Sequence, residues 1–365
     1  MIPMQQQPSH PLLPGVLVGH DTDQRRPTGV TDDLLPEGTT TGVDVRGAAP
    51  GTRETDLLQP VNTMQGADAV MLSGGSAFGL DAAGGVMGWL EGQGRGVQVG
   101  AVRVPIVPAA VIFDLWLGDP AVRPDTESGA RACAGAVPLA EAPEGNVGAG
   151  AGASVGKLLG PLLAMRGGLG IASVHAHGLT VSAVVVVNAV GDVIDPEHGP
   201  LVGARAAIES LDLAGSVRSL LGVPAPPGPT SDPSREPGAA DDPGQPGSSG
   251  SGANTTIGVI VTDAALSKTQ ATRMAQVAHD GLARTISPVH TSMDGDTLFA
   301  AATGTVDPAV QGALPPDALG ILLPVMAAEA TAHAVLRAIR AAEPLRINGL
   351  WLPAWRDRAE QASGG

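Results

Sequence analysis

A hydroxyl side chain stands where a polar segment of the chain meets an apolar one, at Asn254-Thr255. The Thr255 hydroxyl could attack the carbonyl carbon of Asn254, which would convert the amide to an ester that water then hydrolyses. The new chain would begin at Thr255. Its α-amino group, with an ordinary pKa of about 7.7–8.0, could take the proton of the neighbouring hydroxyl. Linkers also end in Asn or Thr without reacting, so spacing alone leaves both interpretations open.

The segment before this junction differs in composition from the rest of the chain. Residues 223–254 are rich in Pro, Gly, Ser and Asp and almost lack large apolar side chains. Such a composition cannot offset the entropy of ordering, so it predicts a disordered linker. The β-branched run Thr255–Val261 follows directly and predicts a buried strand. We therefore expect one part over 1–222 and a second over 255–365, folded together as one domain.

Apolar patterns on both sides of the linker predict alternating strands and helices. After the linker, Ser267 and Gln270 form a capping box at the start of a helix with apolar residues on one face. The other expected helices are Gly79–Gly92, Leu201–Leu211 and Met326–Arg340, the last starting just after Pro324. The expected strands are Val16–Gly19, Thr40–Arg46, Ala67–Ser73, Thr180–Val190 and Thr297–Thr303. Together these elements predict an α/β fold with two sheets covered by helices on both outer faces, an αββα sandwich.

Composition and charge exclude several classes of protein. The chain has 365 residues, enough for a sizeable core, and its 2 % aromatic residues include no Tyr, so small side chains must fill the interior. A net charge of −15 argues against binding nucleic acid or anionic membranes. We expect neither a signal peptide nor a membrane span, which needs an apolar run of about 18 residues. The single cysteine, Cys133, allows no internal disulfide, so a cytoplasmic protein is expected.

Several other motifs fall short of a known site. Gly148–Gly152 with Lys157 lacks residues that a Walker loop requires, and no acidic residue completes a dinucleotide fingerprint. His175 and His177, expected on one face of a strand, have no third metal ligand nearby. Gly75–Gly79 departs by one residue from the G-x-S-x-G motif. We therefore expect neither a cofactor nor a metal.

Seven motifs of the chain occur in the order found in one known family. They are Val43–Gly47, Pro50–Glu54, Leu72–Leu80, Val104–Pro108, Phe113–Leu115, Thr255–Ile260 and Met293–Ala300. With them the chain resembles the P1 family of self-cleaving peptidases, which includes L-aminopeptidase/D-esterases, β-peptidyl aminopeptidases and nylon-oligomer (6-aminohexanoate-oligomer) hydrolases. The resemblance covers nearly the whole chain except the linker and the two ends. It implies an αββα fold of the N-terminal-nucleophile type, autoproteolysis into α and β chains, and homo-oligomers of αβ units.

The resemblance also implies roles for five residues. Thr255 matches the catalytic nucleophile, Lys157 a lysine beside it that adds positive charge, and Asn188 an amide that helps to hold the oxyanion. Asp294 and Asp296 match a carboxylate pair that would orient and ionise the new amine. One fixed oxyanion donor is typically worth about 10²–10³ in rate. Without the resemblance, Asn188 could cap a strand, Lys157 could be solvated, and Asp-Gly-Asp could be a turn.

One feature departs from the family. Its members often carry a tyrosine that positions substrate or oxyanion; this chain has none, and Arg123 is a candidate for one such position. The expected function is hydrolysis of small peptides, amides or linear 6-aminohexanoate oligomers through an acyl-enzyme on Thr255. Two alternatives remain open. One is an ornithine-acetyltransferase-like acyltransferase that passes the acyl group to an amine, and the other is a non-enzymatic small-ligand-binding module.

Overall fold

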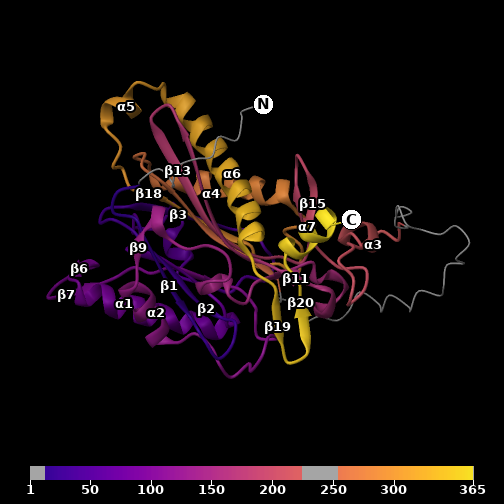
Figure 1. The fold of residues 1–365 in the computed structure, drawn as a ribbon. Helices are drawn as coiled ribbons and strands as arrows, with labels where there is room; N and C mark the ends of the chain where they lie inside the picture. Colours follow the sequence, from indigo (N-terminus) through magenta and orange to yellow (C-terminus); the bar gives the residue numbers. More distant parts are fainter. Residues whose placement is uncertain (1–12, 224–253, 365) are drawn as a thin grey trace, which may run out of the picture.

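Two β-sheets pack face to face in the computed structural model, which describes residues 13–223 and 254–364 (Figure 1). Helices cover the outer face of each sheet, so the layer order is αββα, as predicted. The first sheet has the order β4 (Thr52–Arg53), β8 (Ala109–Val111), β5 (Ala69–Ser73), β2 (Gly29–Leu34), β1 (Leu17–Thr22), β9 (Val137–Pro138). The second has the order β12 (Gly168–Ala176), β13 (Leu179–Asn188), β16 (Thr255–Thr262), β18 (Thr297–Ala302), β3 (Thr40–Val45).

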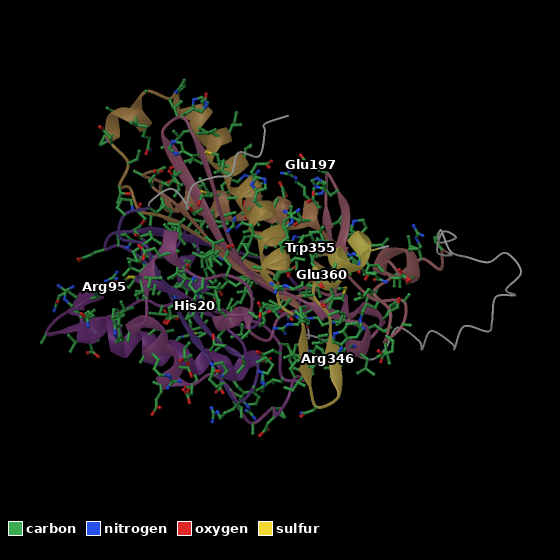
Figure 2. All side chains as sticks on the ribbon, viewed as in Figure 1. His20, Arg95, Glu197, Arg346, Trp355 and Glu360 are labelled. Carbon is green, nitrogen blue, oxygen red and sulfur yellow. The ribbon has the colours of Figure 1, made fainter. Side chains whose placement is uncertain are left out.

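The helices divide between the two sheets. The first sheet is covered by α1 (Ala82–Gly92) and α2 (Thr126–Ala134), and the second by α4 (Lys268–Thr285) and α6 (Pro316–Ala341). The smaller elements are β6 (Val97–Val99), β7 (Val102–Val104), β10 (Ser154–Val155), β11 (Met165–Arg166), β14 (Asp192–Asp195), β15 (Gly199–Val202), β17 (Ile286–Ser287), β19 (Leu345–Ile347), β20 (Leu350–Leu352), α3 (Ser216–Leu220), α5 (Pro308–Gly312) and α7 (Trp355–Gly364). Figure 2 labels Arg346, which lies in the β19–β20 hairpin, and Trp355, which begins α7.

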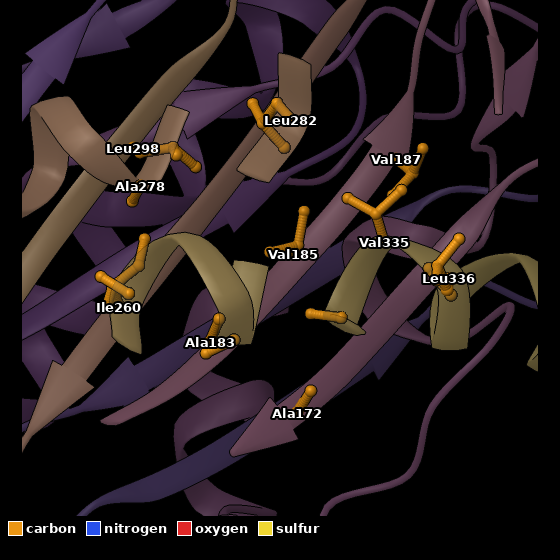
Figure 3. Packing of buried hydrophobic residues seen from close by; sticks show 14 of the residues in the cluster. Ala172, Ala183, Val185, Val187, Ile260, Ala278, Leu282, Leu298, Val335 and Leu336 are labelled. Atoms are coloured by element: carbon orange, nitrogen blue, oxygen red, sulfur yellow. The ribbon is translucent and has the colours of Figure 1, made fainter. Parts of the chain in front are cut away.

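The sequence of strand β13 is apolar along most of its length because both faces of this strand are buried. Its side chains alternate between two buried layers because both faces of the sheet are covered. Val184 and Val186 point into the layer between the sheets. Ala183, Val185 and Val187 pack instead against α4 and α6, next to Leu282 and Val335 (Figure 3). Fully burying each valine contributes about 1.5–3 kcal/mol, so this strand is a rigid support for residues at its ends.

Strand β16 lies in the middle of the second sheet. It pairs antiparallel with β13 on one side and parallel with β18 on the other. Its residues 255–262 are all buried, which confirms the strand predicted from the β-branched run. The predicted linker 223–254 lies almost entirely outside the described residues. Strands from both sides of it nevertheless share one sheet, since β13 and β3 precede it and β16 and β18 follow it.

Two predicted helices have different bounds or do not form. The capping box of Ser267 and Gln270 is present at the start of α4. The prediction for 201–211 was wrong: its apolar residues begin in β15, which pairs with β14, and the chain then turns. Helix α6 starts at Pro316, earlier than predicted, and contains Pro324. A long helix tolerates the one lost hydrogen bond, because apolar residues on both sides of Pro324 are buried in the core.

Helix α6 also bears on the expected absence of a membrane span. Its residues 317–341 are long and apolar enough to cross a membrane, by length and composition alone, contrary to the sequence-based expectation. In the fold, 61 % of the apolar window is buried inside the protein. The buried side chains pack on the second sheet and on α4, as in the core helix of a layered fold.

Candidate active site

Thr255 begins the central strand of the second sheet. It lies opposite Asn188, the last residue of β13, and only 3 % of its surface is exposed. The preceding residue, Asn254, forms a bridge to Asp294 in the loop before β18. The Thr255 hydroxyl donates a hydrogen bond to the Asn254 carbonyl oxygen. The hydroxyl therefore lies against the carbonyl group that it would attack.

A second donor reaches the same carbonyl from Gly295. Its backbone N–H donates to the Asn254 oxygen at 3.0 Å. A side chain does not fit at this position, because an added Cβ would lie 2.8 Å from the Thr255 hydroxyl oxygen and 2.7 Å from the Ala49 carbonyl oxygen. Sequence reasoning missed Gly295. The only available signal was its place between Asp294 and Asp296.

Lys157 and Asn188 form a buried polar pair on the other side of Thr255. The Lys157 ammonium donates to the backbone oxygen of Asn188 at 2.9 Å and to its side-chain oxygen at 2.7 Å. Ser154 N–H also donates to that side-chain oxygen, at 3.1 Å. The amide nitrogen of Asn188 donates to the Phe113 carbonyl at 3.4 Å. In this arrangement Asn188 does not donate to the Asn254 carbonyl; Gly295 does.

Burial changes the protonation of Lys157. It lowers the pKa of the lysine from its usual value to about 7, against the opposing effects of Asp294 and Asp114. A neutral amine still has the two N–H groups that the bonds to Asn188 require. A lysine with such a pKa can exchange a proton near neutral pH. The positive charge expected from the sequence is therefore held fully only below about pH 7.

The carboxylates of Asp294 and Asp296 are both buried, and each has specific donors. Asp296 accepts from the Thr256 N–H at 2.6 Å through one oxygen and from the His290 ring at 2.8 Å through the other. Asp294 accepts from the Thr291 N–H at 2.8 Å. Burial, and then the charge of Asp296, raise the pKa of Asp294, while Lys157 opposes the rise.

The chain segment after β3 holds this acidic loop in place. The backbone N–H groups of Arg46 and Gly47 donate to the Asp296 carbonyl oxygen at 2.9 and 3.0 Å. Ala49 N–H donates to the Asp294 carbonyl oxygen at 2.9 Å. All five residues assigned from the resemblance thus lie around one end of β16, linked through direct hydrogen bonds or strand pairing.

Other candidate residues lie elsewhere or make different contacts. His177 is in the turn after β12 with φ 53°, so it does not share a strand face with His175, contrary to the prediction. Among the described residues, no group of three or more His, Cys, Asp or Glu could hold a metal. Arg123 stacks over the Phe78 ring at 3.7 Å and donates to the Pro120 carbonyl.

The αββα layers, with a central strand that opens on the candidate nucleophile, are those of the N-terminal-nucleophile (Ntn) hydrolase fold. Two solved structures share this fold. A β-aminopeptidase of Burkholderia sp. matches with TM-score 0.64 and 23 % identity over 95 % of this chain and 92 % of its own. The L-aminopeptidase D-Ala-esterase/amidase of Ochrobactrum anthropi matches with TM-score 0.63 and 18 % identity over 96 % and 92 %.

Sequence comparison gives the family. The model of peptidase family S58 matches residues 13–349, and the chain belongs to this family. An uncharacterized aminopeptidase of Mycobacterium tuberculosis is 43 % identical over 347 residues, 92 % of this chain and 91 % of the relative. A 6-aminohexanoate-oligomer endohydrolase of Kocuria sp. is 33 % identical over 298 residues, 81 % of this chain and 75 % of the relative.

Proposed function

We propose that this peptidase cuts its own backbone between Asn254 and Thr255 and then hydrolyses peptide-like amide bonds through an acyl-enzyme on Thr255. The observation that carries the proposal is the environment of the Asn254 carbonyl. It receives the Gly295 N–H at 3.0 Å and lies against the Thr255 hydroxyl. A donor fixed on a carbonyl oxygen stabilises the negative charge that develops there during attack.

Self-cleavage needs a base, because the α-amino group of Thr255 does not yet exist. Lys157, with a pKa of about 7, can take the hydroxyl proton. The Thr255 oxygen then bonds to the Asn254 carbonyl carbon, and the bond from that carbon to the Thr255 nitrogen breaks as the nitrogen gains a proton. Water hydrolyses the resulting ester, which leaves a carboxylate on Asn254 and a free amine on Thr255.

In turnover the free amine of Thr255 serves as the base for its own hydroxyl. The hydroxyl oxygen attacks the substrate carbonyl, the amine product leaves with a proton, and water releases the acyl group. Asn188 can then offer its amide nitrogen to the substrate oxyanion, since its bond to the Phe113 carbonyl is long at 3.4 Å. Asp294, which bridges to Asn254, and Asp296, which accepts from the Thr256 N–H, would orient the Thr255 amine between them.

The relatives support the substrate class. Those named aminopeptidases are 43–45 % identical to this chain, and those named 6-aminohexanoate-oligomer endohydrolases are 32–33 % identical. We propose small peptides or amides with a free amino terminus as substrates, together with linear 6-aminohexanoate oligomers. Release of amine from both classes by the purified protein would be compared at equal bond concentration.

The test of self-cleavage is an intact mass of the purified protein beside Thr255→Ala. The wild type is expected to give two chains of roughly 25 and 11 kDa, scaled by length from 36.3 kDa, and Thr255→Ala one chain. Thr331→Ala is the control, because it removes another buried threonine hydroxyl, in α6, and should leave cleavage intact. A folded wild type that stays whole, or a Thr255→Ala protein that splits at the same bond, would overturn the proposal.

We also propose that several copies assemble in the cytoplasm. Assembly is supported by the β6–β7 hairpin, where Val97 faces Val104 and Val99 faces Val102, all at least 36 % exposed. Such an apolar face is typical of an interface. The cytoplasm is supported by Cys133, a buried free thiol. A light-scattering mass of a single 36.3 kDa unit would contradict assembly.

A further inference from the structure

The His290 ring is bound to the back of the acidic loop. Its Nδ1 lies 2.8 Å from Asp296 Oδ2, and its backbone N–H donates to the same oxygen at 3.2 Å. The other oxygen, Oδ1, accepts the Thr256 N–H at 2.6 Å. His290 thus supplies two of the three hydrogen bonds that hold this carboxylate.

The ring is itself held in one orientation. His279 of α4 meets it edge to face, with ring centroids 4.9 Å apart. His279 is fixed in turn by a contact of 3.2 Å between its Nε2 and the Asp44 carbonyl oxygen. Burial lowers the pKa of His279 to about 3, so this ring is neutral near pH 7 and bears no charge against His290.

The backbone of His290 adopts a conformation that few residues take. Its φ is 55°, in the left-handed region, which is costly for residues other than glycine. This conformation turns both the N–H and the ring of one residue toward the same carboxylate oxygen. Strain of this kind persists where surrounding contacts require it. Here those contacts are the two hydrogen bonds from His290 to Asp296.

From Asp296 the constraint reaches the candidate nucleophile. Its bond to the Thr256 N–H fixes the peptide plane between residues 255 and 256, and that plane sets the direction of the Thr255 Cα–Cβ bond. We propose that His290 is a positioning residue of the Thr255 centre, which holds Asp296 in the orientation that aligns the nucleophile. The inference rests on the proposed self-cleavage and goes beyond it, because neither the family motifs nor the sequence assigned a role to this histidine.

The charges around the ring set the expected pH dependence. The groups that face it or its partners are Asp296 and Asp294 in its own loop, His279 on α4, Asp44 and Arg46 from β3 and its end, and Lys157 across the site. A donated hydrogen bond favours the ionised form of a carboxylate. Loss of the His290 ring should therefore move the acidic limb of the cleavage profile to higher pH.

The experiment compares His290→Ala with His290→Asn across pH 5 to 9. Asparagine keeps a nitrogen donor near the place of Nδ1, whereas alanine removes it. Cleavage of freshly synthesised precursor would be followed on gels, and the kcat and KM of processed enzyme would be measured on one peptide amide. We expect His290→Ala to slow cleavage and kcat about tenfold to a hundredfold, with KM little changed, and His290→Asn to recover most of the rate and the acidic limb.

His177→Ala provides the matched control. His177 also has a positive φ, 53°, but lies at the far end of β13 from Asn188. His177→Ala should leave the cleavage rate and its pH profile unchanged. This control separates the effect of the contact between His290 and Asp296 from the effect of removing a strained histidine. Equal rates and an unshifted limb in His290→Ala would overturn the positioning role while self-cleavage stands. No cleavage in the wild type would instead overturn the proposed function. A rate loss in His290→Asn as large as in His290→Ala would assign His290 to folding rather than positioning.

Discussion

In the described part of the chain, two pairs of buried acids, Asp294/Asp296 and Asp32/Asp33, differ in how they are bonded. Asp294 and Asp296 beside Thr255 accept hydrogen bonds from backbone N–H groups and from a histidine. Asp32 and Asp33 in β2 are equally inaccessible, yet Asp33 has no hydrogen-bond partner on either oxygen. Asp32 has a contact with the Cys133 thiol at 3.2 Å.

The difference indicates what would let a buried carboxylate serve the proposed site. Burial raises the pKa of Asp32 and Asp33 well above the usual range and favours their neutral forms. Near Thr255 burial also raises the pKa of Asp294, but hydrogen bonds from Thr291 and the charge of Lys157 oppose that rise. Adjacent residues of a strand also point to opposite faces, so Asp32 and Asp33 cannot converge. Asp294 and Asp296 lie in the loop before β18, and both contact the start of β16 or the residue before it.

The sharpest way to break this comparison is to neutralise one acid of each pair. Asp296→Asn replaces one of the two acceptor oxygens with an NH₂ group, which then faces either the His290 donors or the Thr256 N–H. We therefore expect self-cleavage to slow about a hundredfold. Asp33→Asn changes an acid that burial already favours as neutral, and it should leave the rate unchanged. The rate would be measured by gel on precursor made in cell-free synthesis. Equal losses of cleavage rate in both variants would mean that the hydrogen bonds to Asp296 give it no role that Asp33 lacks.

Lys157 is a second difference between the two pairs of acids, because its positive charge opposes the rise in the pKa of Asp294. If neutral Lys157 takes the hydroxyl proton, self-cleavage of the wild type should rise with pH through about 7. Lys157→Met keeps an unbranched side chain that is one atom shorter and has no proton to exchange. It should be slower at every pH, by about a hundredfold, without that rise. A wild-type rate that falls above pH 7 would assign the lysine an electrostatic role instead.

The smallest expected effect concerns the stability contributed by the unbonded pair. Asp33 lies opposite Val18 and Val70, which belong to the apolar layer between the sheets. Asp33→Leu has the same number of non-hydrogen side-chain atoms and no unsatisfied oxygen. It should therefore raise the free energy of unfolding by about 1–3 kcal/mol, with Asp33→Asn as the polar control.

The pH dependence of that gain has a definite sign. The folded-state pKa of Asp33 is raised, so its contribution to stability is retained below the unfolded value, about 3.9, and is lost as pH rises toward the folded value. The advantage of Asp33→Leu should therefore be larger at pH 8 than at pH 5 in denaturant titrations. An advantage that is constant with pH would mean that Asp33 does not change its protonation on unfolding.

Local patterns in the sequence predicted most of the fold. The apolar runs of β13 and β16 indicate strands buried on both faces, and the capping box of Ser267 and Gln270 marks the start of α4. The failures have physical causes. In the predicted helix 201–211, only Leu201 and Val202 lie in β15, which pairs with β14, and the chain then turns. Pro324 lies within a helix that burial sustains on both sides.

The candidate site was less accessible to sequence reasoning. Thr255 and the two aspartates stood out through the composition change and the family motifs. The register that places Asn188 opposite Thr255 joins strands far apart in the chain, and no local pattern encodes it. Gly295 acts through its backbone N–H, which no side-chain pattern reveals. His290 depends on a left-handed backbone that favours other residues.

The place of β16 between β13 and β18 has a consequence for refolding from denaturant. While the chain is continuous, β16 belongs to the same molecule as the strands that it pairs with, so folding is a first-order process. If the chain is cut after Asn254 as we propose, the central strand belongs to a separate chain, and the sheet can re-form only when two molecules meet. Refolding then depends on concentration. At high dilution the cleaved protein would then be kinetically stable: it would stay native because it unfolds slowly, and not because it refolds after each unfolding.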